Sequence, residues 1–388
     1  TWVIGGDEAG NSATLSVSRE NGSFFNSALG SDATVELGEN GKLRIEGNGS
    51  GYGTISLSQT FAGSGVIEVV NTSSHTSPFS FEFSTIWDPD AFDGTLSLSS
   101  NQLSMDVGGN ANTGGSNNAH NLANADLILS NGAIINVNGD VKTFDRVSSS
   151  DNGTFKLSGL GFSSPDAVIV GISKLTVGSI DLADGQKLTL QVNDLSENAD
   201  LLGSVRQSSL ISGGINPFQT LIATEDGIEL NGGTFDEHFV FSGVDDSKSY
   251  TQDISDGNNT VASGYYKIKL ALGNNGNDLG IQYTLDRIDI LDTQTLTLSE
   301  TGFLDAQITS SGNGNLTIAS TGDISLTNGE NTYTGNTTID AGGRLVATQG
   351  ALGQTDELFV SGTYVNSGAN TAIGLMSVRP ANLNLMPI

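Results

Sequence analysis

The chain has 388 residues, of which 43 are acidic and 15 basic, so its formal net charge is −28. This charge argues against nucleic acid as a partner, because binding to phosphates requires Lys and Arg, and against adsorption to an anionic membrane for the same reason. Cysteine is absent, which excludes disulfide scaffolds and thiolate metal sites. No apolar run approaches the ~20 residues of a membrane-spanning helix, so we expect no membrane insertion of this segment.

Short apolar alternations, broken by Gly, Asn and Asp, dominate the chain from its start. The 51 glycines and only 6 prolines differ from a flexible linker, which is rich in both. The chain begins inside a strand pattern without a signal peptide, so we expect a mature protein or an excised fragment. In chain order, strands are predicted at residues 43–46, 54–58, 66–70, 126–129, 134–137, 316–318 and 323–326.

The segment near residues 75–94 departs from this pattern through its aromatic residues. Phe79, Phe81 and Phe83 alternate strictly, which predicts stacking in the core. Next come Trp87 and Asp88, then a proline and Asp90, a composition typical of an exposed loop where a ring and carboxylates could bind sugar or a basic protein. We name Trp87, Asp88 and Asp90 as the candidate binding loop; a Trp87 that is simply packed is the alternative.

A second excursion is predicted near residues 265–285. Two alternating runs, 265–272 and 279–285, flank the turn Gly273–Asp278, which indicates a β-hairpin that projects from or braces the main body. The turn faintly echoes a calcium-binding nonapeptide, but that site needs stacked repeats. A short helix is expected only around residues 118–125.

Many short strands and turns leave a sandwich, a barrel or a β-helix as possible folds. Strand-turn units recur over hundreds of residues, outward positions are rich in Thr, Ser and Asn that can stack between rungs, and Gly and Asn stand at corners. We therefore predict an all-β, right-handed parallel β-helix. Rungs of ~20 residues spaced ~4.8 Å apart would give a rod on the order of 90 Å long.

The last third carries a specific motif. Residues 331–339 read NTYTGNTTI, followed by AGGRLV at 341–346 and QGALG at 349–353. Tyr333 and Ile339 are expected to face the core and Gly335 to turn a corner. The motif resembles the passenger-associated repeat of bacterial autotransporters. The structural repeat residues are Asn331, Tyr333, Gly335, Thr337, Ile339 and Leu345.

The resemblance implies a type V secreted passenger of the AIDA-like, self-associating group, exported across the outer membrane to the cell surface. It implies a β-helical passenger at 1–300, with excursions near 75–94 and 265–285, and rungs with the repeat at 301–376. The tail at 377–388 does not fit the repeat and is expected to be linker or added sequence. Such passengers mediate cell adhesion, aggregation, biofilm formation and virulence. The membrane barrel that belongs to the family is not expected within these 388 residues.

Candidate chemistry is sparse, and we expect neither a catalytic residue nor a cofactor or metal. His75, His120 and His238 lie far apart without ligand spacing, and no serine stands in a G-x-S-x-G nucleophile motif. Paired acids occur at Asp88 with Asp90, at 225–226 and at 245–246. They leave open a glycan-active enzyme, a glycosidase or polysaccharide lyase, on the same scaffold.

The expected function is that of an adhesin rather than an enzyme. Partners would be identical passengers on neighbouring cells, joined by many weak contacts, or host matrix proteins such as collagen, laminin and fibronectin, whose basic patches fit the charge. A glycan partner is possible, although heparin-like glycans fit the charge poorly. A spacer that lifts another domain from the surface is the further alternative.

Overall fold

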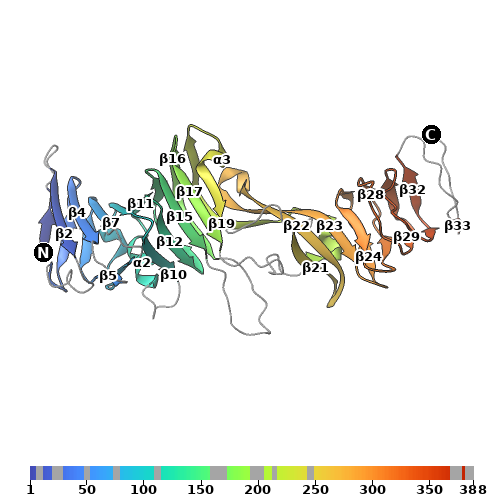
Figure 1. Ribbon diagram of the computed structural model, residues 1–388, viewed down its shortest axis with the longest axis horizontal. Coiled ribbons are helices and arrows are strands. Elements are labelled where there is room, and N and C mark those ends of the chain that lie inside the picture. Colours follow the sequence, from blue (N-terminus) through green and yellow to red (C-terminus); the bar gives the residue numbers. More distant parts are fainter. Residues whose placement is uncertain are drawn as a thin grey trace.

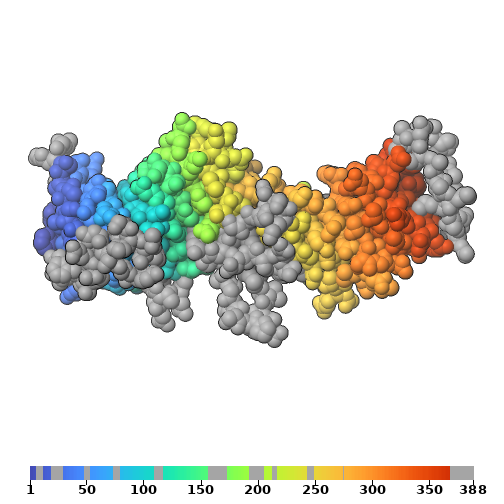
Figure 2. Space-filling view, viewed as in Figure 1, coloured from blue at the N-terminus to red at the C-terminus, as the bar shows by residue number. Residues whose placement is uncertain are grey.

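The computed structural model describes residues 1–5, 12–19, 29–47, 53–72, 79–108, 115–157, 173–192, 205–211, 216–242 and 249–367, and the backbone of 378–380. The molecule is elongated, and its strands lie across the long axis in chain order (Figure 1). Figure 2 shows the same order as successive colour bands from one end to the other. Each segment therefore packs mainly against its neighbours in the chain, as in a solenoid.

The amino-terminal part is a three-sided coil of parallel strands. One turn of the coil runs through β4 (Gly41–Gly47), β5 (Gly53–Leu57) and β6 (Thr60–Gly63), and the chain then reaches β7 (Val66–Asn71). β7 pairs in parallel with β4, with Leu43 opposite Ile67. This stacking of strands from successive turns confirms the predicted parallel β-helix.

The strands of the described ranges form five sheets, three of them in the amino-terminal part and the junction that follows it. The three-stranded sheet contains β1 (Trp2–Ile4), β3 (Thr34–Leu37) and β6. The seven-stranded sheet contains β5, β8 (Phe79–Phe83), β10 (Leu103–Gly108), β12 (Ala133–Asn138), β15 (Asn152–Leu157), β17 (Lys187–Val192) and β20 (Phe239–Ser242). The fourteen-stranded sheet contains β2 (Ala13–Arg19), β4, β7, β9 (Thr95–Ser99), β11 (Asp126–Ser130), β13 (Asp140–Lys142), β14 (Arg146–Ser149), β16 (Lys174–Ala183), β18 (Val205–Arg206), β19 (Phe218–Asn231), β21 (Tyr250–Asp256), β22 (Asn259–Gly273), β23 (Asp278–Ile290) and β26 (Gln307–Ser310).

The carboxy-terminal part has two further parallel sheets. One contains β24 (Thr295–Leu298), β27 (Asn315–Ile318), β29 (Thr337–Ile339), β31 (Leu358–Val360) and β33 (Val378–Pro380); the other contains β25 (Gly302–Leu304), β28 (Asp323–Leu326), β30 (Arg344–Ala347) and β32 (Thr363–Asn366). The helical elements within the described ranges are α2 (Gly115–Asn121), α3 (Phe235–His238) and the 3-10 turns η1 (Pro89–Ala91), η3 (Gln207–Ser209) and η5 (Asn274–Gly276).

Alternating side chains fill the narrow interior of the coil. Along β4 every second residue is buried, including Leu43 and Ile45, which are inaccessible to solvent. Burial of one such side chain contributes about 1.5–3 kcal/mol relative to exposure. Because each rung supplies only a few of these side chains, stability accumulates along the rod rather than in one globular centre.

In the segment near 75–94, where an excursion is predicted, residues 79–83 form β8, which lies within the stack of rungs. β8 pairs in parallel with β5 on one side and with β10 on the other. Phe79, Phe81 and Phe83 are all buried, which confirms the predicted core stacking. Phe79–Phe83 therefore do not form the predicted excursion, because an alternating aromatic run looks the same in a solenoid strand as in a projecting hairpin. Residues 75–78 of the predicted excursion lie outside the described part.

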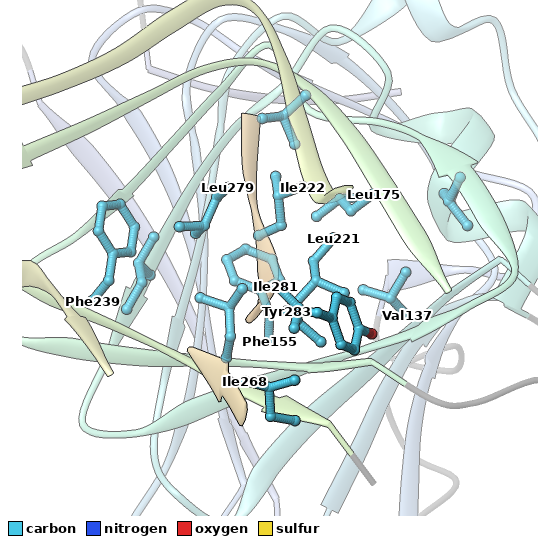
Figure 3. Packing of buried hydrophobic residues seen from close by; sticks show 14 of the residues in the cluster. Val137, Phe155, Leu175, Leu221, Ile222, Phe239, Ile268, Leu279, Ile281 and Tyr283 are labelled. Carbon is cyan, nitrogen blue, oxygen red and sulfur yellow. The ribbon is translucent and has the colours of Figure 1, made fainter. Parts of the chain in front are cut away.

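The predicted hairpin is present, and it joins the two parts of the rod. β22 and β23 pair antiparallel around the turn at Asn274–Gly276. β23 pairs antiparallel with the start of β19, and its far end pairs in parallel with β26. Figure 3 shows buried side chains of the amino-terminal part packed against those of the hairpin, among them Ile222 of β19, Ile268 of β22 and Ile281 of β23.

Rung length differs between the two parts. In the carboxy-terminal part the register advances 20 residues from Leu296 to Leu316 and 21 from Leu316 to Thr337, close to the expected ~20. In the amino-terminal part the advance varies, from 20 residues between Leu127 and Val147 to 33 between Val147 and Ile180. Of the predicted tail, Val378–Pro380 continues the stack as β33, in parallel with β31; the other residues of 377–388 lie outside the described part.

Candidate interaction surfaces

Trp87 of the candidate binding loop lies in the core. Its side chain is only 7% exposed, and its ring packs edge-on against Phe83, with ring centroids 4.7 Å apart, and against Phe61 at 5.4 Å. An exposed binding ring is therefore excluded, and the packed alternative is correct. The reason is that α2 closes this side of the rung: the Asn121 side chain accepts a hydrogen bond from the Trp87 backbone N–H at 3.1 Å and donates one to Thr85 at 2.8 Å.

The two carboxylates of the loop do face solvent. Asp88 caps η1 by accepting a hydrogen bond from the backbone N–H of Asp90 at 3.1 Å. Asp90 accepts a hydrogen bond from the Asn124 side chain at 2.8 Å. The loop therefore offers two ordered, exposed carboxylates and no exposed Trp87 ring.

The repeat at Asn331 is a buried polar connection between three rungs. The side-chain oxygen of Asn331 accepts a hydrogen bond from the backbone N–H of Ile308 at 2.7 Å, and its amide donates to the carbonyl of Ala351 at 2.7 Å. Asn331 is 6% exposed. Because one side chain satisfies backbone groups of the rung before and the rung after, it fixes their register.

A chain of hydroxyls continues this connection inside the repeat. The phenolic oxygen of Tyr333 lies 2.8 Å from the hydroxyl of Thr337, which lies 2.9 Å from the hydroxyl of Thr355. Thr355 donates to the carbonyl of Gly335 at 2.7 Å. Burial raises the pKa of the Tyr333 phenol far above its ordinary range. These hydroxyls are therefore neutral donors and acceptors that hold a rung together.

The other repeat residues take the expected positions. Ile339 and Leu345 are fully buried, and Leu345 lies in β30 between Ile324 and Tyr364 of the neighbouring rungs. Gly335 stands at a corner where an added Cβ atom would lie 2.4 Å from the carbonyl oxygen of Gly314. The motif thus specifies rung geometry, and none of its side chains is presented as a ligand site.

Outward side chains of the seven-stranded sheet form a row in register. Each of the seven strands supplies one side chain to the row; five of them carry hydroxyls, and the other two are an isoleucine and a terminal valine. Its members are Thr54, Ser80, Ser104, Ile134, Thr154, Thr189 and Val240. In the adjacent row, the Asn136 amide donates to the Asp106 carboxylate of the next rung at 2.6 Å. This sheet therefore presents a continuous polar face along the amino-terminal part of the rod.

Charged side chains also pair between rungs. Arg44 of β4 binds Glu68 of β7, and Arg146 of β14 binds Asp126 of β11. Arg344 of β30 binds an oxygen of Asp323 in β28 at 2.5 Å. Since several of the 15 basic residues are paired in this way, the acids that remain dominate the outer electrostatics.

In the described residues, the predicted acid pairs and histidines do not come together in one site. Glu225 is bound to Lys142, and the pair at 245–246 lies outside the described part, as does His75. His238 is buried, with its Nδ1 2.8 Å from the Gln186 carbonyl oxygen. Across the described ranges, no group of three or more His, Asp or Glu side chains is placed to hold a metal ion. Within the same ranges, no helix is long and apolar enough to cross a membrane.

Comparison with known proteins shows a partial similarity to a bacterial lipoprotein. A stretch of 120 residues, 30% of this chain, is 34% identical to the uncharacterized lipoprotein YdeK of Escherichia coli strain K12. The match covers 9% of that protein's length, so this chain corresponds to a small part of it. No family model matches the chain, and no solved structure is significantly similar.

Proposed function

We propose that this chain is a β-helical segment of a bacterial cell-surface adhesin, resembling the passenger of an autotransporter, that acts by binding rather than by catalysis. The observation that carries the proposal is the outward row on the seven-stranded sheet. It places one hydroxyl on most rungs along a face that spans the amino-terminal part of the rod. Two such faces on neighbouring cells could form many weak hydrogen bonds, and multivalency would add them into firm adhesion.

The charge of the chain supports two kinds of partner. A second copy is compatible with a net charge of −28 only where the contacting face is polar more than ionic, as this hydroxyl row is. A matrix protein with basic patches, such as collagen, laminin or fibronectin, would be attracted by the acidic surface as a whole. The name of the related Escherichia coli protein, a lipoprotein, supports a location in the cell envelope, and the autotransporter-like repeat supports export across the outer membrane to the cell surface.

The experiment is an aggregation assay with beads that carry the purified chain, followed by light scattering. A double variant, Thr54→Glu with Ser104→Glu, adds two carboxylates to the row, two strands apart. We expect the wild-type beads to aggregate and the variant beads to stay dispersed, because like charges then meet across the contact. Adhesion of the same beads to wells coated with collagen, laminin or fibronectin separates binding to matrix from binding to self.

A matched control is available in the carboxy-terminal part. Thr297 and Thr338 face outward on strands two apart in the sheet that contains β24 and β29, and Thr297→Glu with Thr338→Glu adds the same charge. This control should aggregate as the wild type does. Wild-type beads that neither aggregate nor bind matrix, or an equal loss in both variants, would contradict the proposal.

A further inference from the structure

A groove of about 530 Å³ runs across four rungs at the corner between the fourteen-stranded and seven-stranded sheets. Its walls come from the end of β7 and from the turns that follow β9, β11 and β14. The side chains that matter in this groove are Ser99, Asn101, Asn131, Asp151 and Asn152. A volume of this size is typical of a site for a small ligand.

The corner is held by hydrogen bonds between rungs. The amide of Asn131 donates to the hydroxyl of Ser99 at 2.8 Å. One carboxylate oxygen of Asp151 accepts the backbone N–H of Asn131 at 2.7 Å and that of Asn152 at 2.5 Å. Asn131 and Gly132 both have positive φ, 51° and 74°. A Cβ at Gly132 would lie 3.1 Å from the Cβ of Asn101, so glycine keeps this part of the groove open.

The lining argues against charged ligands. None of the residues around the groove is Lys or Arg, so an anion would meet no countercharge in a protein that is already strongly acidic. The only carboxylate among the lining residues is that of Asp151, and one of its oxygens already accepts two backbone N–H groups. A divalent cation needs about six oxygen ligands, several of them from carboxylates.

The lining also argues against an extended peptide. Peptides that add to a sheet need a free strand edge and pockets for alternate side chains. At this corner the backbone N–H of Asn131, Gly132 and Asn152 are already bonded within the fold. What remains are side-chain amides and hydroxyls, which present donors and acceptors together without net charge.

We infer that this groove binds an uncharged oligosaccharide that lies along the rod axis. Sugar hydroxyls are both donors and acceptors, and they match asparagine amides and serine hydroxyls. Successive rungs advance by about 4.8 Å, close to the length of one hexose unit in an extended glycan, so each rung can contact one sugar. This inference goes beyond the proposed function, because it concerns a corner of the rod and a soluble ligand rather than the hydroxyl row and a second copy.

The test is an array of neutral oligosaccharides made of glucose, galactose, mannose and N-acetylglucosamine units, with sulfated glycans, calcium and an extended peptide as additional probes. The best neutral glycan is then titrated calorimetrically. We expect a double variant, Asn101→Ala with Asn131→Gly, to weaken its binding at least tenfold. Glycine suits the positive φ at position 131, so the corner keeps its backbone geometry. Asn101→Ala alone, at an exposed position, gives a second reading if the double variant does not fold.

The matched control is Asn231→Ala, at an exposed asparagine that bonds Asp181 of the neighbouring strand at 2.9 Å outside the groove; its affinity should stay within twofold of the wild type. The inference would be overturned if no neutral glycan bound, or if only the sulfated glycans, calcium or the peptide bound. It would also be overturned if both groove variants kept the wild-type affinity. The bead assay distinguishes the two proposals, because groove variants should aggregate as the wild type does without any glycan.

Discussion

Asn331 carries a larger structural role than its position in a loop suggests. Its side chain bonds the backbone of Ile308 in the preceding rung and of Ala351 in the following rung, both at 2.7 Å. The repeat motif identifies this asparagine from the sequence, but its partners lie 23 and 20 residues away. These separations can be recognised as contacts between neighbouring rungs only once the rung length is known.

Replacement Asn331→Ala should lower the free energy of unfolding by about 2–4 kcal/mol, because it leaves a buried N–H and a buried carbonyl without partners. Denaturant unfolding followed by circular dichroism measures the change. Asn328→Ala is the matched control, since Asn328 also bonds backbone groups, the Asp305 carbonyl at 2.9 Å and the Glu330 N–H at 2.8 Å, but where water can replace it. Equal losses in the two variants would refute the role assigned to Asn331.

Buried tyrosines should make the free energy of unfolding decrease at alkaline pH. Burial raises the pKa of Tyr266, Tyr283 and Tyr333 far above the value of about 10 for free tyrosine. Because the folded-state pKa is the higher one, their contribution is complete below about pH 10 and declines as the pH rises above it. We expect the free energy of unfolding to fall between about pH 10 and 12, measured by denaturation at each pH. Tyrosinate absorbance that rises fully near pH 10 in a still folded chain would contradict this burial.

At the scale of elements, the junction around β19 and β23 decides how the two parts of the rod are joined. β19 pairs in parallel with β16 and antiparallel with β23. At Gly280 of β23, an added Cβ would lie 2.2 Å from the carbonyl oxygen of Gln219 in β19. Only glycine therefore allows the two strands to approach this closely.

Gly280→Ala should cost about 1–3 kcal/mol through overpacking at this contact. Gly53→Ala is the control, since a Cβ there would meet only the Phe79 ring, at an ordinary 3.9 Å. Thermal melts of both variants measure the difference. A melt of Gly280→Ala that coincides with the wild type would show that the junction does not depend on this contact.

The sequence predicts individual elements better than their arrangement. The alternation of residues 265–272 and 279–285 around a glycine and asparagine turn indicated the hairpin, and the repeat indicated the buried positions of Tyr333 and Ile339. The sequence left open whether Trp87 is packed or exposed, because its contact with Asn121 of α2, 34 residues away, was not predictable. The groove was equally hidden, since its walls come from the end of one strand and from three turns whose spacing varies with rung length.

At the scale of the whole molecule, different residues stabilise the rod and form its outer surface. The interior is a thin column of apolar side chains crossed by buried polar connections such as Asn331. The exterior carries the hydroxyl row, ion pairs between rungs and an excess of acids. A long rod with a repeated polar face suits contacts that are weak individually and strong in number, which is the physical basis of the adhesin proposal.

The hydroxyl row and the groove both depend on successive rungs that stack in register, and pulsed electron paramagnetic resonance measures that stacking directly. The chain has no cysteine, so spin labels can be attached at engineered cysteines alone. Labels at Thr54 and Thr154, four strands apart in the seven-stranded sheet, should lie about 19 Å apart, and labels at Thr54 and Thr189, five strands apart, about 24 Å. Ser80 and Thr189, again four strands apart, should reproduce the first distance. Distances that do not increase with the number of intervening strands would contradict the stacked coil and remove the hydroxyl row that depends on it.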